Sequence, residues 1–154
     1  MKPQSHEGNC HCQSIGFVFR TAVAPEQWPI RSCSCTFCRT RGVLSTSDPA
    51  GSLRFVERVP RTLHAYRFGQ KTADFLICRN CGTYVGASMQ SGNRAFGIVN
   101  ARVLLSLAAR FAEPQPMNYG GESSADRLAR RESRWTPLEL EPPLTAPAVR
   151  VKRR

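Results

Sequence analysis

Long hydrophobic runs are missing from this sequence, and its N-terminus has no signal-peptide pattern. The longest mainly apolar stretch, residues 103–109, is far shorter than the roughly 18 residues that a membrane-spanning helix needs. Residues 1–7 contain no apolar run of the kind found in signal peptides. We therefore expect a cytoplasmic protein without a membrane segment, and in that compartment disulfides are rare.

Acidic residues, lysines and common catalytic motifs are also scarce. No two of the 11 acidic residues have a spacing that suggests acid–base catalysis by a carboxylate pair. The sequence contains no G-x-x-x-x-G-K-S/T phosphate loop, no H-E-x-x-H motif and no G-x-S-x-G motif. Only three of the 22 basic residues are lysines, and the other 19 are arginines, whose planar guanidinium groups suit carboxylates and phosphates. The composition therefore points to anionic partners.

The formal net charge of +11 makes nucleic acid a candidate partner. The basic residues are scattered, however, because residues 1–121 hold 14 basic and 6 acidic residues. No basic run interleaved with aromatic residues occurs apart from the short C-terminal tail. Nucleic-acid binding is therefore not expected.

The length of 154 residues and the hydrophobic fraction of 41% favour a single domain with a real core. Ile15, Phe17 and Phe19 alternate with other residues, as in a strand with one buried face. In a second segment, Leu53 and Val59 are predicted to lie on the buried face of a strand. The predicted strands are residues 14–20, 53–59, 63–68, 73–77, 83–89 and 95–99. Their local connections favour a mainly β fold of short antiparallel strands.

The sequence changes character after residue 100. Residues 103–109 fit either a short helix or a buried extended segment, and residues 113–116 are predicted to be a linker. Residues 123–135 are predicted to form a short amphipathic C-terminal helix with Ser123 as its N-cap, and Pro137 is expected to end it. The expected apolar face of this helix contains Ala125, Leu128 and Trp135.

These elements predict one domain over residues 1–137, with its core at about residues 8–100. Residues 138–154 are rich in proline and arginine, and we expect them to form a mobile tail.

Seven cysteines fall into three groups with the spacing of metal ligands. The groups are Cys10 and Cys12; Cys33, Cys35 and Cys38; and Cys78 and Cys81. The C-x-x-C turn of the last group brings two sulfurs to about 3.8 Å, the separation of thiolates around zinc, and Gly82 can turn the chain back with a positive φ. An odd number of cysteines would also leave one thiol outside a disulfide framework.

A structural zinc ion needs four ligands, and two groups compete to complete the C-x-x-C pair. If Cys10 and Cys12 join it, a closed four-thiolate site forms, and the triplet is left with three ligands and an open fourth position, as in catalytic sites. If the triplet joins it, five ligands compete for four positions. Two other interpretations remain open: one structural zinc with three incidental thiols, and disulfides.

The three histidines, His6, His11 and His64, are not included in either site. His11 stands between the two ligands of the C-x-C pair in the sequence, and its side chain should point away from the metal. His64 lies in a predicted strand as a packed or surface residue.

The order and spacing of these motifs resemble the glutathione-dependent formaldehyde-activating enzyme (Gfa) family, which also includes centromere protein V. The resemblance rests on Gly8-x-Cys10-x-Cys12, Cys33-x-Cys35-x-x-Cys38-Arg39 and Cys78-x-x-Cys81-Gly82, and covers about residues 8–100. Residues 118–123, 130–131 and 134–137 are similar to the C-terminal ends of many bacterial members. Ser34 is a departure, since many members have histidine there, but that residue is not a ligand in the family.

The resemblance implies a β-tent fold with zinc knuckles, two zinc ions and carbon–sulfur lyase activity on S-(hydroxymethyl)glutathione. By position, the structural zinc ligands are Cys10, Cys12, Cys78 and Cys81, and the catalytic zinc ligands are Cys33, Cys35 and Cys38. The expected partners are a small thiol such as glutathione and an aldehyde such as formaldehyde. Arg39 and Arg41, just after the triplet, are candidates to bind a carboxylate of the thiol.

Other functions remain open at this point. The domain could be a non-catalytic, zinc-stabilised binding module in which a fourth residue of the chain closes the triplet site. Association with nucleic acid is the second alternative, and a homo-oligomer is compatible with the sequence.

Overall fold

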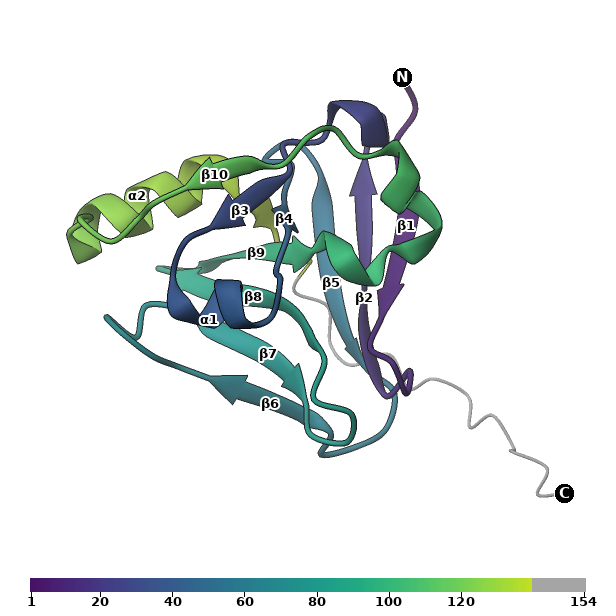
Figure 1. Cartoon of the computed structure of the whole chain (residues 1–154), viewed down its shortest axis with the longest axis horizontal. Coiled ribbons are helices and arrows are strands. Elements are labelled where there is room, and N and C mark those ends of the chain that lie inside the picture. The colour runs from purple at the N-terminus through teal and green to yellow at the C-terminus, as the bar shows by residue number, and fades with distance from the viewer. Residues whose placement is uncertain (140–154) are drawn as a thin grey trace, which may run out of the picture.

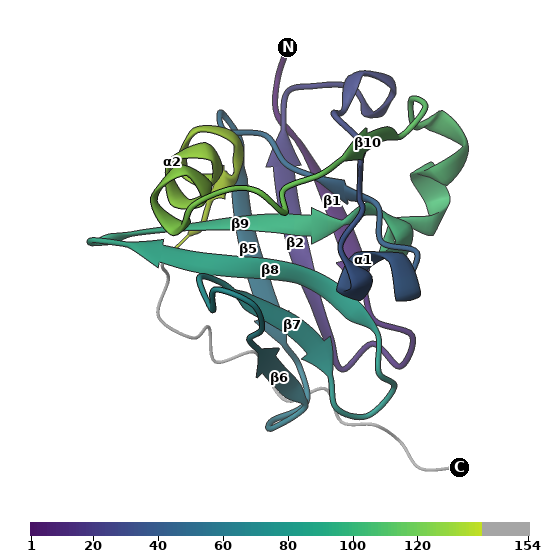
Figure 2. The same ribbon diagram turned by 60° about the vertical axis from the view of Figure 1, so that its left-hand side comes forward.

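The computed structural model describes residues 1–139, which fold into two β-sheets with short helices (Figures 1 and 2). The smaller sheet contains, in spatial order, β1 (Gln4–Asn9), β2 (Ile15–Thr21) and β5 (Ser52–Glu57). The larger sheet has the order β10-β3-β4-β9-β8-β7-β6, and β11 pairs with β9. Its strands are β3 (Arg31–Cys33), β4 (Ser45–Thr46), β6 (Leu63–Tyr66), β7 (Asp74–Cys78), β8 (Tyr84–Ser91), β9 (Arg94–Asn100), β10 (Gln115–Met117) and β11 (Thr136–Pro137).

Neighbouring strands in both sheets are antiparallel, except that β10 runs parallel to β3. The helices are α1 (Thr36–Thr40), α2 (Ser124–Arg134) and the 3₁₀ helices η1 (Pro25–Gln27), η2 (Ala101–Val103) and η3 (Leu105–Arg110). The predicted mainly β fold of antiparallel strands with a short C-terminal helix is therefore confirmed. The open question over residues 103–109 is settled as 3₁₀ turns.

The main core lies between the two sheets. Ile15, Phe17 and Phe19 are buried there, as their alternation predicts, because successive side chains of a strand point to opposite faces. The larger sheet contributes the buried residues Leu76, Val85 and Val99 to the same core.

The two sheets approach each other closely at glycines of the larger sheet. A Cβ atom at Gly86 would lie 2.5 Å from the carbonyl oxygen of Ile98 and 2.9 Å from the ring of Phe55. A Cβ atom at Gly97 would lie 2.7 Å from a methyl group of Leu53. Glycine at these positions lets β5 pack directly on β8 and β9.

The other face of the larger sheet carries both α-helices. Ala87 and Ile98 pair across β8 and β9. Trp135, directly after α2, packs in the same cluster as this pair. Phe37 of α1 packs edge-on against Tyr84 of β8, with ring centroids 5.2 Å apart. The two helices thus cover neighbouring parts of one sheet face.

The N-cap of α2 is formed as predicted. Ser123 Oγ accepts a hydrogen bond from the backbone N of Asp126 at 3.1 Å and lies 2.8 Å from the carboxylate of the same residue. This reciprocal contact satisfies a backbone donor of the first turn. Trp135 is buried and Leu128 is partly buried, but Ala125 is exposed, so its predicted place on the buried face is wrong.

The sequence pattern misses the strands β1, β3, β4, β10 and β11. β1 is mostly polar and exposed, and it joins the sheet through backbone pairing with β2, which leaves no hydrophobic alternation. The predicted linker over residues 113–116 overlaps β10, which pairs with β3. The strand predicted over residues 53–59 ends at Glu57, and Val59 is 48% exposed rather than sharing a buried face with Leu53.

The chain also stays paired beyond residue 137, where the predicted domain ends. The backbone N of Leu138 donates to the carbonyl of Ala95 at 2.9 Å, and that of Glu139 donates to the carbonyl of Leu53 at 2.8 Å. The rest of the predicted tail, residues 140–154, lies outside the described residues.

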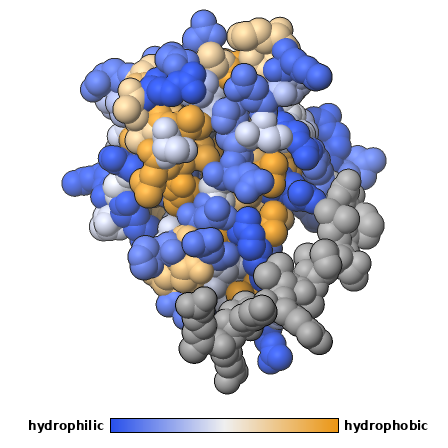
Figure 3. Space-filling view, turned by 90° about the vertical axis from the view of Figure 1, so that its right-hand side faces the viewer, coloured by the Kyte–Doolittle hydropathy of each residue, from blue (hydrophilic) through white to orange (hydrophobic). Residues whose placement is uncertain are grey.

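Large hydrophobic residues are seldom strongly exposed on the surface. On the face shown in Figure 3, one hydrophobic area lies on the left of the view and is bordered by hydrophilic residues. The large hydrophobic residues exposed in the described part of the chain are Met1, Val59, Tyr66 and Leu105. They come from separate segments, and isolated exposed residues of this kind are normal. Among residues 1–139, no helix has the length and apolar character needed to cross a membrane.

The tight packing around Gly86 predicts that Gly86→Ala destabilises the fold by about 1–3 kcal/mol, since the new methyl group meets the Phe55 ring of the smaller sheet and the carbonyl oxygen of Ile98 in the neighbouring strand. Urea denaturation at saturating zinc measures the difference. Gly121→Ala is the matched control, because a Cβ at Gly121 has no atom within 4 Å. Equal midpoints for both variants would contradict the proposed packing constraint.

Candidate functional site

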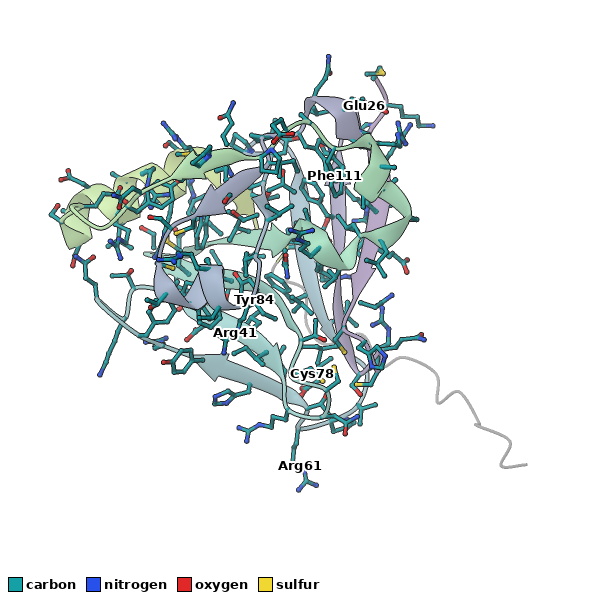
Figure 4. All side chains as sticks on the ribbon, viewed as in Figure 1. Glu26, Arg41, Arg61, Cys78, Tyr84 and Phe111 are labelled. Carbon is teal, nitrogen blue, oxygen red and sulfur yellow. The ribbon has the colours of Figure 1, made fainter. Side chains whose placement is uncertain are left out.

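Four cysteines meet where two hairpin turns face each other. Cys10 and Cys12 lie in the turn between β1 and β2, and Cys78 and Cys81 lie in and after the end of β7. Cys12 Sγ is 3.7 Å from Cys10 Sγ and 3.6 Å from Cys78 Sγ. Cys78 is seen near the lower end of the molecule in Figure 4. Because one turn belongs to each sheet, this four-cysteine cluster joins the two sheets.

Both turns are held by short backbone hydrogen bonds. Gln13 has a φ of 64°, and its N donates to the carbonyl of Cys10 at 2.9 Å. Gly82 has a φ of 77°, and its N donates to the carbonyl of Cys78 at 2.8 Å. The positive φ predicted for Gly82 is therefore confirmed, and it lets the chain reverse directly after Cys81.

The four sulfur atoms are spaced as tetrahedral metal ligands. Thiolates bound to zinc at about 2.3 Å lie about 3.8 Å apart, close to the separations seen here. All four sulfurs lie within 4.8 Å of one another. Burial raises the pKa of Cys10 to about 11, whereas a hydrogen bond with Ser14 lowers the pKa of Cys12 to about 5. A divalent cation would allow all four thiols to ionise together, which is the state that metal ligands require.

The other three cysteines surround the start of α1 and form a three-cysteine cluster. Cys33 ends β3, Cys35 is the N-cap of α1 and Cys38 lies in its first turn. The backbone N of Cys38 donates to Cys35 Sγ at 3.5 Å, so the helix cap itself brings two of the sulfurs together. A hydrogen bond between Cys33 and Cys38 raises the pKa of Cys38 and lowers that of Cys33 to about 5. The three sulfurs lie within 4.8 Å of one another.

The seven cysteines thus divide into four and three, as their spacing predicts, and both sets could hold a metal ion. All seven are free, so the described residues contain no disulfide. Neither cluster includes a histidine. His6 instead packs edge-on against Trp28 with ring centroids 5.0 Å apart, and the backbone N of His11 donates to Thr83 Oγ1 at 3.4 Å.

A cavity of about 370 Å³ lies beside the three-cysteine cluster and is lined by its three residues. The four-cysteine cluster does not line it. Tyr84, visible beside α1 in Figure 4, also lines the cavity and is 5% exposed. Burial, with the nearby charges of the three cysteines, raises the pKa of the Tyr84 hydroxyl. This hydroxyl therefore stays protonated and can donate a hydrogen bond.

Within residues 1–139, five arginines and no acidic residue line the same cavity; we call these five arginines the arginine wall. They are Arg31, Arg127, Arg130, Arg131 and Arg134. The last four lie on α2 at spacing i, i+3, i+4 and i+7, which places them on one side of the helix. This periodicity is visible in the sequence, but a prediction based on apolar residues overlooks it. Nothing in the sequence pattern singles out Arg31.

Arg39 and Arg41, the candidates to bind a carboxylate of the thiol, do not line the cavity. Both side chains are exposed, and the guanidinium of Arg41 lies over the ring of Phe37 at 4.1 Å. They are close to the three-cysteine cluster in sequence, but α1 and the turn after it leave them on the outside of the protein.

No protein-family model matches the chain, and no curated protein matches it. A crystal structure of a Rhodobacter sphaeroides protein, determined as a structural genomics target without a functional name, is similar to it. The two chains are 26% identical, with 79% of this chain and 94% of that chain covered and a TM-score of 0.51. This similarity supports the fold and carries no functional assignment.

The position of the four-cysteine cluster between the sheets predicts that Cys81→Ser abolishes folding, because the loss of one ligand removes metal-coupled folding energy. Far-UV circular dichroism and zinc analysis of the purified chain would measure the loss. Retention of native structure with full zinc content would contradict the structural role of this cluster.

The three-cysteine cluster lies on one sheet face beside a cavity, and Cys35→Ser is expected to leave a folded protein with half the zinc of the wild type. Ser34→Ala is the matched control, since Ser34 is an exposed neighbour that belongs to neither cluster. If Cys35→Ser and Cys81→Ser unfold alike, the division of roles between the clusters is wrong.

Proposed function

We propose that the protein is a zinc-dependent enzyme of the carbon–sulfur lyase type that makes or breaks the bond between a small thiol and an aldehyde carbon. The observation that carries this proposal is that the three-cysteine cluster lines a cavity of about 370 Å³, large enough for a small molecule. The resemblance of the cysteine motifs to the Gfa family supports it and suggests glutathione and formaldehyde as the reactants.

Both clusters are proposed to bind zinc. The four-cysteine cluster has a complete tetrahedral ligand set, as in structural sites. In the three-cysteine cluster, a bound zinc ion would supply a fourth position at which a soft substrate sulfur binds as a thiolate. Within residues 1–139 no histidine, cysteine, aspartate or glutamate completes that set, which disfavours a module closed by its own fourth ligand. The need for reduced cysteines favours a compartment such as the cytoplasm.

The proposed reaction needs a nucleophilic sulfur, a positioned aldehyde and a proton donor. The thiolate sulfur forms a bond to the aldehyde carbon, the π electrons of the carbonyl move to oxygen, and a proton transferred to that oxygen completes the hydroxymethyl thioether. The proton that the thiol releases when it forms the thiolate returns to this oxygen through solvent, so the reaction balances. Tyr84 is proposed to donate a hydrogen bond to the oxygen, because its hydroxyl stays protonated. The reverse reaction breaks the carbon–sulfur bond, and neither direction requires an oxidant.

The arrangement of positive charge does not favour nucleic acid as the partner. Three arginines outside the cavity pair with carboxylates: Arg20 with Glu139, Arg67 with Asp74 and Arg110 with Glu26. Five more line a cavity of small-molecule size. The positive charge of these arginines is therefore distributed over ion pairs and a pocket.

Exchange NMR with ¹³C-formaldehyde and glutathione is expected to show that the zinc-loaded protein accelerates exchange between the free aldehyde and its thiol adduct by about 10-fold or more. Cys35→Ser should lose the acceleration, and Arg39→Gln should keep it because Arg39 is exposed and lies outside the cavity. Full zinc content without acceleration, for glutathione and for other thiols, would instead favour a non-catalytic binding module.

Tyr84→Phe should lower the exchange rate by about 100-fold at unchanged zinc content, because it removes one hydrogen-bond donor and leaves the packed ring. The rate and the zinc content are measured on the same sample. A rate equal to that of the wild type would show that the Tyr84 hydroxyl has no part in the reaction.

A further inference from the structure

Arg131 is a buried cation without a carboxylate partner among the described residues. It is 7% exposed and lines the cavity. Its Nη1 donates to Thr72 Oγ1 at 2.8 Å, its guanidinium lies 4.7 Å from the centre of the Trp135 ring, and its Nε has no hydrogen-bond partner. Burial, reinforced by the neighbouring arginines, lowers its pKa to about 10. A guanidinium removed from water in this way is costly unless an anion compensates it.

Two more members of the arginine wall have unsatisfied binding capacity. Arg31 donates to Ser47 Oγ at 3.0 Å, and among residues 1–139 no carboxylate lies within ion-pairing distance of it. Arg127 donates to the carbonyl of Tyr119 at 2.7 Å, but its Nε has no hydrogen-bond partner and lies 4.0 Å from Glu122. Each guanidinium has five N–H donors, so most donors of both remain available.

The nearby carboxylate is already used. Glu122 accepts two hydrogen bonds from Arg130, at 2.8 and 2.9 Å, and the Arg130 guanidinium also stacks on Tyr119 at 3.7 Å. In the part of the chain that the structure describes, no acidic residue lines the cavity. The three cysteines are the other source of negative charge there, and a zinc ion bound to them would leave a single negative charge opposite five arginines. The cavity therefore keeps a surplus of positive charge.

We propose that Arg31, Arg127 and Arg131 form an anion subsite that binds a carboxylate or phosphate group of the small-molecule ligand. The inference rests on the proposed function for the other end of that ligand, whose thiol would lie at the three-cysteine cluster. The planar forks of arginine suit such oxyanions, and a cavity of about 370 Å³ favours a group of a small molecule. The site would then select small anionic thiols over neutral and cationic ones.

Calorimetric titration of the zinc-loaded full chain with matched thiols tests the subsite. We expect 3-mercaptopropionate to bind at least about 10-fold more tightly than neutral 2-mercaptoethanol, and cationic cysteamine to bind most weakly. Succinate and inorganic phosphate, which lack a thiol, should compete with 3-mercaptopropionate and distinguish the two oxyanion types. Equal affinity for the three thiols would overturn the proposal.

Arginine variants test whether the anionic thiol binds at the arginine wall. Arg131→Met and Arg127→Gln should each weaken 3-mercaptopropionate binding by about 10-fold and leave 2-mercaptoethanol binding unchanged. Arg127 is less buried than Arg131, so its variant keeps the test available if Arg131→Met does not fold. Arg39→Gln is the matched control, with the same change of charge close to the cysteines but outside the cavity. A loss of the same size in Arg39→Gln would overturn the subsite.

A direct readout separates this proposal from the proposed enzymatic function. In ¹⁵N NMR spectra, the Nε–H signals of Arg127 and Arg131 should shift on titration with succinate, which involves neither thiol nor aldehyde. Shifts without any thiol–aldehyde exchange would leave the subsite standing and contradict the enzyme. Absence of shifts and of competition by succinate and phosphate would contradict the subsite, even if exchange were observed.

Discussion

The convergence of two hairpin turns on four sulfur atoms is the contact on which the arrangement of the sheets depends. The turn that carries Cys10 and Cys12 belongs to the smaller sheet, and the turn that carries Cys78 and Cys81 belongs to the larger one. A metal ion bound there would connect elements far apart in the sequence at a single point. The hydrophobic core between the sheets extends from this point, and Gly86 allows the contact to be close.

The candidate active site lies on the opposite face of the larger sheet, whose side chains do not pack in the core between the sheets. There α1 presents the three-cysteine cluster and α2 presents arginines to one cavity. Natural proteins seldom bury unpaired charge for stability alone, since desolvation of a guanidinium costs more than its packing returns. Arg131 is buried and has no carboxylate partner within residues 1–139, which supports the proposed anion subsite; in the proposed function it would bind the charged end of the ligand whose thiol lies at the cysteines.

Local sequence patterns correctly predict several elements of the structure. The alternation around Phe17 correctly predicts a strand with a buried face, and Ser123 with Asp126 correctly predicts where α2 begins. The strands β1, β3, β4, β10 and β11 escape prediction because they are short, polar or both, and are held by backbone pairing with neighbours distant in sequence. Ala125 shows a related limit, because apolar character alone does not decide which side of a helix is buried.

The sequence by itself determined the grouping of the cysteines, because metal-ligand spacing within a turn is a local property of the chain. It also determined the mainly β class and the C-terminal helix. Only the tertiary structure decided which cations face the cysteines: Arg39, a near neighbour of Cys38, lies outside, whereas Arg31 and Arg131 line the cavity. The reason is physical, since the lining of a cavity depends on how separate elements pack on the sheet and not on their distance along the chain.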